Sequence, residues 1–157
     1  MAIYNILTSQ DPLLRKKSKK ITEVDHKIKK IINDLFDTLY ATPSGVGLAA
    51  PQIGILKQVI VIDTGEEEPF ALINPEIISG TGQVDSEEGC LSCPDQNGIV
   101  SRYETVKVEA LNEEGQPVLI EADGFLAIVL QHEIDHLQGV LFIDKYIPTA
   151  REEKVAE

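Results

Sequence analysis

This sequence is short of cysteine and of long apolar segments, and it contains no tryptophan. Two cysteines among 157 residues are too few for a disulfide scaffold, which excludes a small secreted fold held by disulfides. No apolar run reaches the roughly 18 residues that a membrane-spanning helix requires. The first residues also lack the basic-then-apolar order of a signal peptide. We therefore expect a soluble, cytoplasmic protein with no membrane partner.

Basic residues are scarce and unevenly placed. The formal net charge of −12 argues against a nucleic-acid-binding protein, because phosphate contacts require a basic surface. Residues 1–30 nevertheless hold eight Lys or Arg against three Asp or Glu, whereas the remainder holds six against 23. The basic segment 15–20 could contact an anionic partner such as RNA. We favour the simpler interpretation, a solvated loop before a helix, and expect no direct nucleic-acid site.

Residues 22–41 have the spacing of an amphipathic helix. Thr22, with Asp25 at the third position, resembles a helix N-cap, and the Thr-Pro-Ser-Gly segment 42–45 would end the helix. His26 falls on the polar face and is therefore not expected to be a ligand. The apolar positions expected in the core are Val24, Ile28, Ile31, Ile32, Leu35, Phe36 and Leu39.

The middle of the chain predicts strands. Residues 59–62 and 71–73 are short apolar runs typical of buried strands. Apolar and polar residues alternate in 106–110 and again in 118–122, and the Asn-Glu-Glu-Gly turn between them predicts a hairpin. The small-residue stretch 45–52 suits neither a helix nor an ordinary strand.

Residues 124–138, bounded by Asp123 and Gly139, give the last strong pattern. Because apolar residues occupy most sides, the sequence predicts a buried helix. One amphipathic helix, then strands, then a buried helix indicates an α+β fold, with small antiparallel sheets packed around the helix at about 124–138. Its length and its lack of repeats or linkers predict that residues 1–157 form a single domain.

This helix carries two of the three histidines of the chain, in the order His132, Glu133, Ile134, Asp135, His136. Positions i and i+4 share one helical face, so both imidazoles can reach one metal ion. Glu133 lies about 100° around the helix from His132, which suits a base better than a ligand. The alternative is a pair of core histidines, each of which would need its own hydrogen-bond partner. A metal ion accounts for both at once.

Catalytic metal sites usually have three protein ligands and an open position. Upstream of the helix, Cys90 and Cys93 offer thiolates, although Cys-x-x-Cys alone is a weak signal for a redox or zinc-knuckle site. The chain has no second cysteine pair, and the turn-forming segment 94–98 argues against the helix that a thioredoxin-like site requires. One cysteine with the two histidines is therefore the simplest candidate site.

Three motifs together resemble the peptide deformylase family. They are Gly-Val-Gly-Leu-Ala-Ala-Pro-Gln at 45–52, Glu-Gly-Cys-Leu-Ser at 88–92 and Gln-His-Glu-Ile-Asp-His at 131–136. The resemblance extends from Asp11 to about Pro148, and the three motifs in this order and at these separations are highly specific.

The resemblance implies that Cys90, His132 and His136 bind one divalent metal ion. In this family the ion is usually Fe(II), with Zn(II), Ni(II) or Co(II) as substitutes. It also implies that Glu133 handles the proton, while the Gln52 side chain and the backbone N–H of Leu91 stabilise the oxyanion, as such a reaction requires. The implied activity is hydrolytic removal of the formyl group from the N-terminal formyl-methionine of newly made polypeptides, which releases formate.

The same comparison implies a peptide-binding surface. Gly47 and Gly89 match positions where the family's backbone pairs with an extended peptide, and glycine permits that close approach. A core role is an equally good interpretation of the apolar residues that match the methionine pocket. Those residues are Val46, Leu91, Phe125, Ile128 and Val129.

Two features depart from the family pattern. Residues 150–157 are short and not basic, whereas many relatives end in a basic helix thought to dock on the ribosome. Docking on the ribosome through such a helix is therefore not expected, whereas proximity to the ribosome stays open. Asn97 stands where arginine is frequent, which predicts weaker contact with peptide carbonyls. The sequence also leaves open whether Glu88 orients the loop or reacts.

Two other hypotheses remain at this point. A metallopeptidase of the two-histidine helix class would cleave internal peptide bonds and be indifferent to Cys90. A catalytically silent relative would bind peptides or N-termini without needing Glu133. The intact Gln52, Glu133 and ligand set favour the deformylase hypothesis.

Overall fold

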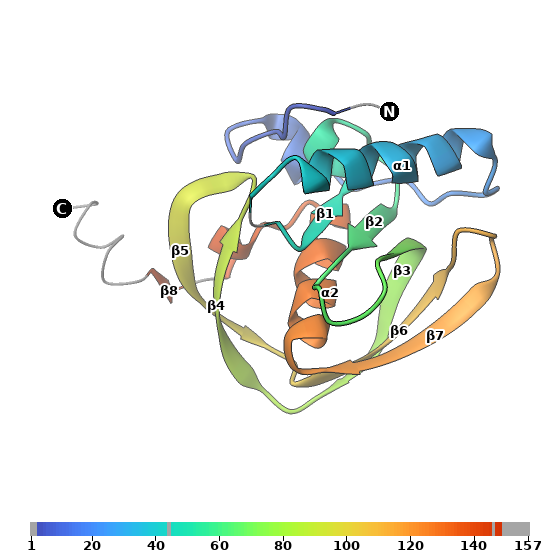
Figure 1. The fold of residues 1–157 in the computed structure, drawn as a ribbon. Coiled ribbons are helices and arrows are strands. Elements are labelled where there is room, and N and C mark those ends of the chain that lie inside the picture. Colours follow the sequence, from blue (N-terminus) through green and yellow to red (C-terminus); the bar gives the residue numbers. More distant parts are fainter. Residues whose placement is uncertain (1–2, 44, 146, 149–157) are drawn as a thin grey trace.

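The computed structural model describes residues 3–43, 45–145 and 147–148, and in it two antiparallel sheets enclose a central helix, α2 (Figure 1). This arrangement confirms the expected α+β class. In chain order the elements are the 3₁₀ turn η1 (Pro12–Arg15), α1 (His26–Tyr40), β1 (Gly47–Ala49), η2 (Ala50–Ile53), β2 (Val59–Ile62), β3 (Phe70–Thr81), β4 (Val84–Cys90), β5 (Cys93–Arg102), β6 (Thr105–Leu111), β7 (Pro117–Asp123), α2 (Gly124–Leu137), η3 (Phe142–Asp144) and β8 (Ile147–Pro148).

The larger sheet has the strand order β1-β2-β3-β6-β7, and the smaller one has the order β4-β5-β8. The expected hairpin is present, since β6 pairs with β7 from Thr105↔Asp123 to Leu111↔Pro117. Strand β1 lies at one edge of the larger sheet and β4 at one edge of the smaller. These two edges flank one cavity.

Strand β2 is apolar throughout because the larger sheet is covered on both faces there. Val59 and Val61 pack with the apolar face of α1, whereas Ile60 and Ile62 pack with α2. All four are at most 1% exposed. The alternation of side chains along a strand therefore places one pair in each of two cores. In Figure 1, α1 crosses the β1–β2 end of the molecule, with α2 at its centre.

Helix α2 confirms the predicted buried helix to within one residue. Ala127, Leu130 and Leu137 on it are completely buried, while Phe125 is half exposed near the beginning of the helix. A helix that is apolar on most sides needs neighbours on most sides, and β1, β2, β3, β6 and β7 supply them. The polar residues that α2 carries into this interior are therefore positioned by packing.

The first predicted helix begins later than expected. The N-cap is Asp25, not Thr22, and α1 starts at His26 rather than at residue 22. The Asp25 carboxylate accepts hydrogen bonds from the backbone N–H groups of Lys27 and Ile28, at 3.1 Å each. That carboxylate satisfies two of the amides that every helix leaves free at its start, which fixes the boundary. His26 is exposed, as expected.

Two segments expected to be irregular are strands. Gly47–Ala49 pairs with Ile60–Ile62 as β1, so the small-residue stretch does contain a strand. Segment 94–98, expected to be a turn, belongs to β5, and its last residue, Gly98, pairs with Glu88 of β4 on one side and with Pro148 of β8 on the other. The turn lies instead at Leu91 and Ser92. In both places strand pairing with distant residues outweighs local composition.

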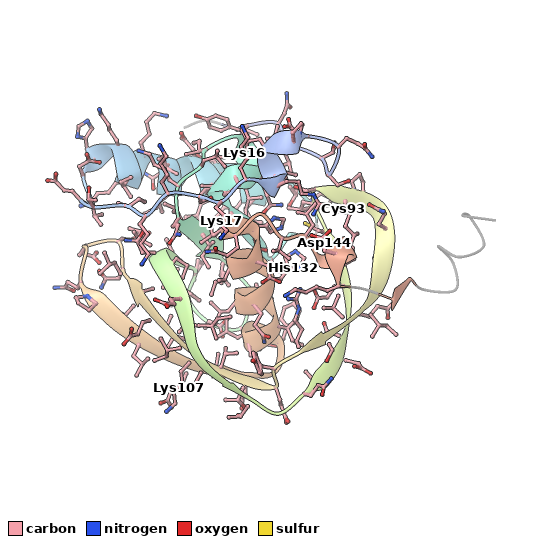
Figure 2. All side chains as sticks on the ribbon, turned by 180° about the vertical axis from the view of Figure 1, so that it is seen from behind. Lys16, Lys17, Cys93, Lys107, His132 and Asp144 are labelled. Carbon is pink, nitrogen blue, oxygen red and sulfur yellow. The ribbon has the colours of Figure 1, made fainter. Side chains whose placement is uncertain are left out.

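The basic segment is an extended stretch with exposed lysines, which agrees with the predicted solvated loop. Lys16 and Lys17 lie on the face seen in Figure 2. The C-terminal segment 150–157, on which the ribosome expectation depended, lies outside the described residues. Among the described helices, none has the length and apolar character needed to cross a bilayer.

Candidate active site

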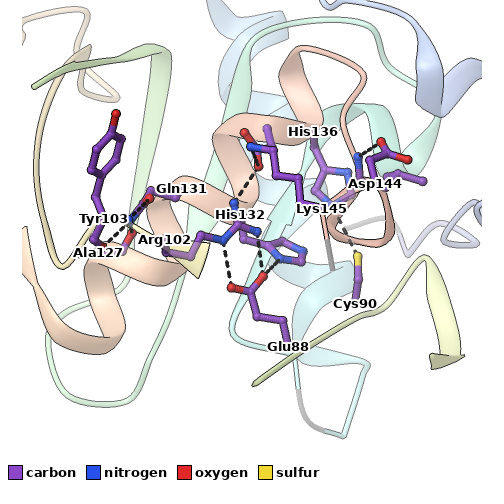
Figure 3. Close-up of polar contacts among 12 residues, drawn as sticks. Glu88, Cys90, Arg102, Tyr103, Ala127, Gln131, His132, His136, Asp144 and Lys145 are labelled. Carbon is purple, nitrogen blue, oxygen red and sulfur yellow. Dashed lines mark hydrogen bonds and ion pairs between the residues drawn. The ribbon is translucent and has the colours of Figure 1, made fainter. Parts of the chain in front are cut away.

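Three potential metal ligands converge beside the middle of α2. His132 and His136 share one face of that helix, and Cys90 comes from the last position of β4. One ligand atom from each of these residues lies within 4.8 Å of the other two. The Cys90 Sγ atom is 3.3 Å from Nε2 of His136, the contact drawn in Figure 3. Among the described residues, this is the one such group of His, Cys, Asp or Glu side chains.

The chemistry of these side chains fits a divalent transition metal. Within the described residues, three buried side-chain polar atoms lack a hydrogen-bond partner, and two of them, Glu133 Oε1 and His136 Nδ1, are at this site. Burial holds the pKa of His136 well below its usual value, so its imidazole is neutral, as a ligand must be. A thiolate with two imidazoles suits Fe(II), Zn(II), Ni(II) or Co(II) better than the oxygen-preferring Mg²⁺ or Ca²⁺.

Glu88 orients His132. Its Oε1 atom is 3.0 Å from Nδ1 of His132, which leaves Nε2 of that ring as the atom that faces the site. Arg102 donates two hydrogen bonds to the same carboxylate, from Nε at 2.9 Å and from Nη2 at 2.7 Å (Figure 3). Burial alone would raise the pKa of Glu88, but the hydrogen bonds from Arg102 and His132 outweigh it and lower that pKa to about 2. Glu88 is therefore a charged group that hydrogen-bonds to the His132 imidazole and fixes the orientation of that ring.

Arg102 also connects the smaller sheet to α2. Its Nη1 atom donates to Oδ2 of Asp135 at 2.7 Å, and Lys145 Nζ donates to the same oxygen at 3.1 Å. Arg102 is 5% exposed, so its own ion pairs are largely shielded from water, whereas the Lys145 pair lies at the surface. Sequence analysis missed Arg102 and Asp135. A usable signal existed, because Arg102 follows Val100 by two positions and so shares its inward face of β5.

Glu133 is packed against the backbone of β1. A Cβ atom built on Gly47 would lie 2.8 Å from Glu133 Oε2, closer than side chains tolerate. Burial raises the pKa of Glu133 to about 7. The carboxyl group therefore occupies a dry position between α2 and β1 that only a glycine at residue 47 leaves open.

The Gln52 amide is fixed at both ends. Its Oε1 atom accepts from the backbone N–H of Ala49 at 2.9 Å, and its Nε2 atom donates to Ser92 Oγ at 3.0 Å. Nε2 is also 3.7 Å from Cys90 Sγ. The side chain is 1% exposed, so an N–H donor is held next to the thiol with little freedom to turn away.

A cavity of about 430 Å³ opens over these groups. Gln52, Cys90, Leu91, His132 and Glu133 contribute to its wall, while His136 lies behind it, 1% exposed. Asn97 also lines the cavity, and a Cβ built on Gly89 would lie 2.8 Å from its Oδ1 atom. The lining includes every residue predicted to contact a peptide: Val46, Gly47, Gly89, Phe125, Ile128 and Val129.

Known sequences match the chain over nearly its whole length. A sequence model of the family described as Polypeptide deformylase matches residues 3–152. Peptide deformylase 2 of Vibrio cholerae is 52% identical over 150 residues, which cover 94% of this chain and 89% of the relative. The peptide deformylase of Natranaerobius thermophilus is 48% identical over 155 residues, covering 98% and 99%.

Solved structures match the fold equally well. A peptide deformylase from Legionella pneumophila superposes with a TM-score of 0.90 at 44% identity, covering 99% of this chain and 91% of that one. The peptide deformylase of Synechococcus elongatus, solved in complex with actinonin, gives a TM-score of 0.89 at 40% identity, covering 98% and 83%. With this agreement in sequence and fold, the chain belongs to the polypeptide deformylase family, metal-dependent hydrolases that remove the N-formyl group from newly made polypeptides.

Proposed function

We propose that this chain deformylates formyl-methionyl peptides at the cavity over α2, with Cys90, His132 and His136 as the metal ligands. The observation that carries this proposal is their convergence at the cavity, beside the buried and unpartnered Oε1 atom of Glu133. A bound divalent cation supplies Lewis acidity, which polarises a carbonyl and makes hydroxide available near neutral pH.

Glu133 moves the proton. Its carboxylate takes a proton from the attacking water and delivers it to the leaving nitrogen, so the C–N bond of the formamide breaks to give formate and a neutral amine rather than an amine anion. Packing against Gly47 holds the carboxylate in the wall of the cavity, within reach of a bound peptide. The fixed position of the Glu133 carboxylate in the cavity wall thus supports its role in proton transfer.

The oxyanion is stabilised by the Gln52 side-chain amide and the backbone N–H of Leu91. Gln52 has two N–H donors and does not ionise, and its Oε1 atom is already held by Ala49. Donors that are in place before the reaction stabilise the developing charge without having to reorganise. Leu91 follows Cys90 at the turn of the β4–β5 hairpin, which places its backbone in the cavity wall.

The peptide binds as an added strand. Gly47 lies on edge strand β1 and Gly89 on edge strand β4, and both line the cavity. An extended peptide between these edges can form backbone hydrogen bonds with both. The apolar wall of the cavity, with Val46, Ile128 and Val129, takes the methionine side chain.

We also propose Fe(II) as the resident ion, with Zn(II), Ni(II) or Co(II) as substitutes, since thiolate and imidazole ligands accept all four. Residues 1–157 act as one catalytic domain, because side chains of the smaller sheet reach α2 at Glu88, Cys90 and Arg102. We further propose that the reaction takes place in the cytoplasm, close to the ribosome, because the family processes formylated nascent chains.

The cysteine pair offers a matched test of the ligand assignment. Cys90→Ser is expected to lower the bound metal per chain at least about tenfold under competition with a chelator, because a serine hydroxyl replaces the soft thiolate. Cys93→Val should keep the metal, since Cys93 packs with Leu14 and Val100 instead of joining the ligand group. Elemental analysis after dialysis measures both. Metal loss only in Cys93→Val would mean that the wrong thiol is assigned.

Gly47→Ala tests the packing of the carboxylate. The added methyl group would displace Glu133, and such a shift of a reacting group is expected to lower kcat by roughly tenfold to a hundredfold. Steady-state kinetics measures the loss of kcat. The melting temperature and the metal content should stay near those of the unmodified protein. A double variant with Glu133→Gln should be no slower than Glu133→Gln alone. Full additivity of the two losses would mean that Gly47 acts by another route.

One assay separates this function from an internal peptidase. The metal-loaded protein is incubated with a formyl-Met-Ala-Ser peptide, and the products are identified by mass spectrometry. Deformylation predicts a single product that retains every residue. Fragments cut at internal bonds, formed equally by Cys90→Ser, would favour the two-histidine peptidase instead.

A further inference from the structure

The proposed mechanism uses Cys90 but not Cys93, and these two cysteines lie opposite each other. Cys90 ends β4 and Cys93 begins β5, and the two residues are direct partners in the antiparallel register across the turn at Leu91 and Ser92. Directly opposed residues in such a pair have Cα atoms about 4.5–5.5 Å apart. A disulfide requires about 4.4–6.8 Å. The hairpin therefore holds the two residues at a separation that a disulfide can bridge.

The side chains, too, are in contact. Both cysteines are free thiols, and their side chains lie close enough to interact. Both also line the cavity, and Cys90 is partly exposed, so a small oxidant in the cavity reaches Cys90 without unfolding of the hairpin. Cys93 is 1% exposed and packs with Leu14, Val100 and Phe142, which keeps its sulfur next to that of Cys90.

We propose that Cys90 and Cys93 form a reversible disulfide on exposure to a peroxide, and that this bond withdraws Cys90 from the metal site. Cys93 is the resolving thiol. The proposed site is thus a redox-modification site made of the whole Cys-x-x-Cys segment, and it gives a function to the buried cysteine that catalysis leaves unused.

The chemistry balances with hydrogen peroxide as the oxidant. The Cys90 sulfur attacks the peroxide, the O–O bond breaks, and sulfenic acid and one water form. The Cys93 sulfur then attacks the sulfenic sulfur, the S–O bond breaks, and a second water leaves as the disulfide forms. Two thiols lose two electrons and two protons in total, and the peroxide takes up both. A dithiol reductant reverses the step by exchange.

The consequence for the metal rests on the proposed function. A thiolate is a metal ligand, whereas a sulfur in a disulfide carries no charge and binds metals weakly. Two histidines alone make a poorer site than two histidines with a thiolate. Disulfide formation is therefore expected to release the ion, while formation of the bond itself requires only the hairpin geometry.

The test uses the full chain loaded with Zn(II), which is itself redox-inert. The protein is treated with hydrogen peroxide, and three quantities are followed: intact mass, iodoacetamide-reactive thiols under denaturing conditions, and zinc released to a chromogenic chelator. The expected mass loss is about 2 Da on the monomer, the two hydrogens of the thiols. Both reactive thiols should disappear, zinc should be released, and dithiothreitol should restore the original mass.

Cys93→Val is the matched control, because valine suits both the strand and the apolar surroundings. Without a resolving thiol, Cys90 should gain mass, about 32 Da for a sulfinic acid, and dithiothreitol should not reverse that gain. The same irreversible gain in the unmodified protein, or a disulfide-linked dimer, would overturn the proposal. Disulfide formation with zinc fully retained would overturn the link to the metal and also the assignment of Cys90 as a ligand. Failure of the disulfide with zinc bound would leave the proposed function intact.

Discussion

Glu133→Gln is expected to lower kcat for a formylated peptide by roughly a hundredfold to ten-thousandfold, the usual contribution of a positioned acid–base group. Glutamine has nearly the shape of glutamate, so it fills the same space between α2 and Gly47, but it cannot take up the proton. Metal content and melting temperature should stay close to those of the unmodified protein. Formate release under single-turnover and steady-state conditions measures the loss.

The matched control is Glu87→Gln, which removes a carboxylate from the same cavity. Glu87 is exposed at the cavity wall, whereas Glu133 is buried in it. The control should retain kcat within about twofold, because a screened surface charge contributes little to the reaction step. Retention of most activity by Glu133→Gln would contradict the role assigned to Glu133.

Arg102→Leu is expected to lower the free energy of unfolding by roughly 3–5 kcal/mol, because it leaves a buried carboxylate without its cation. Glu88 and Arg102 are 7% and 5% exposed, and Arg102 holds both oxygens of Glu88. For a chain of this length the melting temperature should fall by roughly 10 °C. Urea denaturation followed by circular dichroism measures the change.

A double variant distinguishes the lost pair from lost packing. Adding Glu88→Gln to Arg102→Leu removes the stranded charge and should recover part of the stability. Lys107→Gln is the control, because Lys107 and Glu121 form an exposed pair at 3.6 Å whose loss should change stability little. A loss of less than about 1 kcal/mol for Arg102→Leu would show that this pair does not hold the two parts of the site together.

The fold is most predictable from the sequence where buried apolar residues recur with the spacing of a helix or a strand. The buried helix was placed within one residue, because its apolar pattern lies between Asp123 and Gly139. Strand β2 was placed correctly for a related reason, since a sheet covered on both faces leaves an unbroken apolar run. The first helix was misplaced at its start because Thr22 and Asp25 are both good caps. Only the contacts of the Asp25 carboxylate decide between them.

The sequence alone does not reveal which distant residues pair with one another. Segment 94–98 has the composition of a turn, yet it belongs to strand β5, and Gly98 at its end pairs with both β4 and β8. Likewise, the i, i+4 spacing predicted that His132 and His136 share a face, but the support of His132 by Glu88 depends on how β4 lies against α2. Arg102 belongs to that support, and its pairing with Val84 puts it on the same face of the β4–β5 hairpin as Glu88. Local rules indicated the candidate ligands but not the groups that hold them.

Formate release shows whether this site hydrolyses a formamide. The protein is purified without oxygen, loaded with Fe(II) and given a formyl-Met-Ala-Ser peptide, with Glu133→Ala assayed beside it and the peptide chain checked for internal cuts. We predict stoichiometric formate from the unmodified protein, an intact peptide chain, and almost no formate from the variant. No formate from the unmodified protein with its metal site filled would mean that this site does not hydrolyse formamides. Equal formate from both proteins would mean that Glu133 does not transfer the proton.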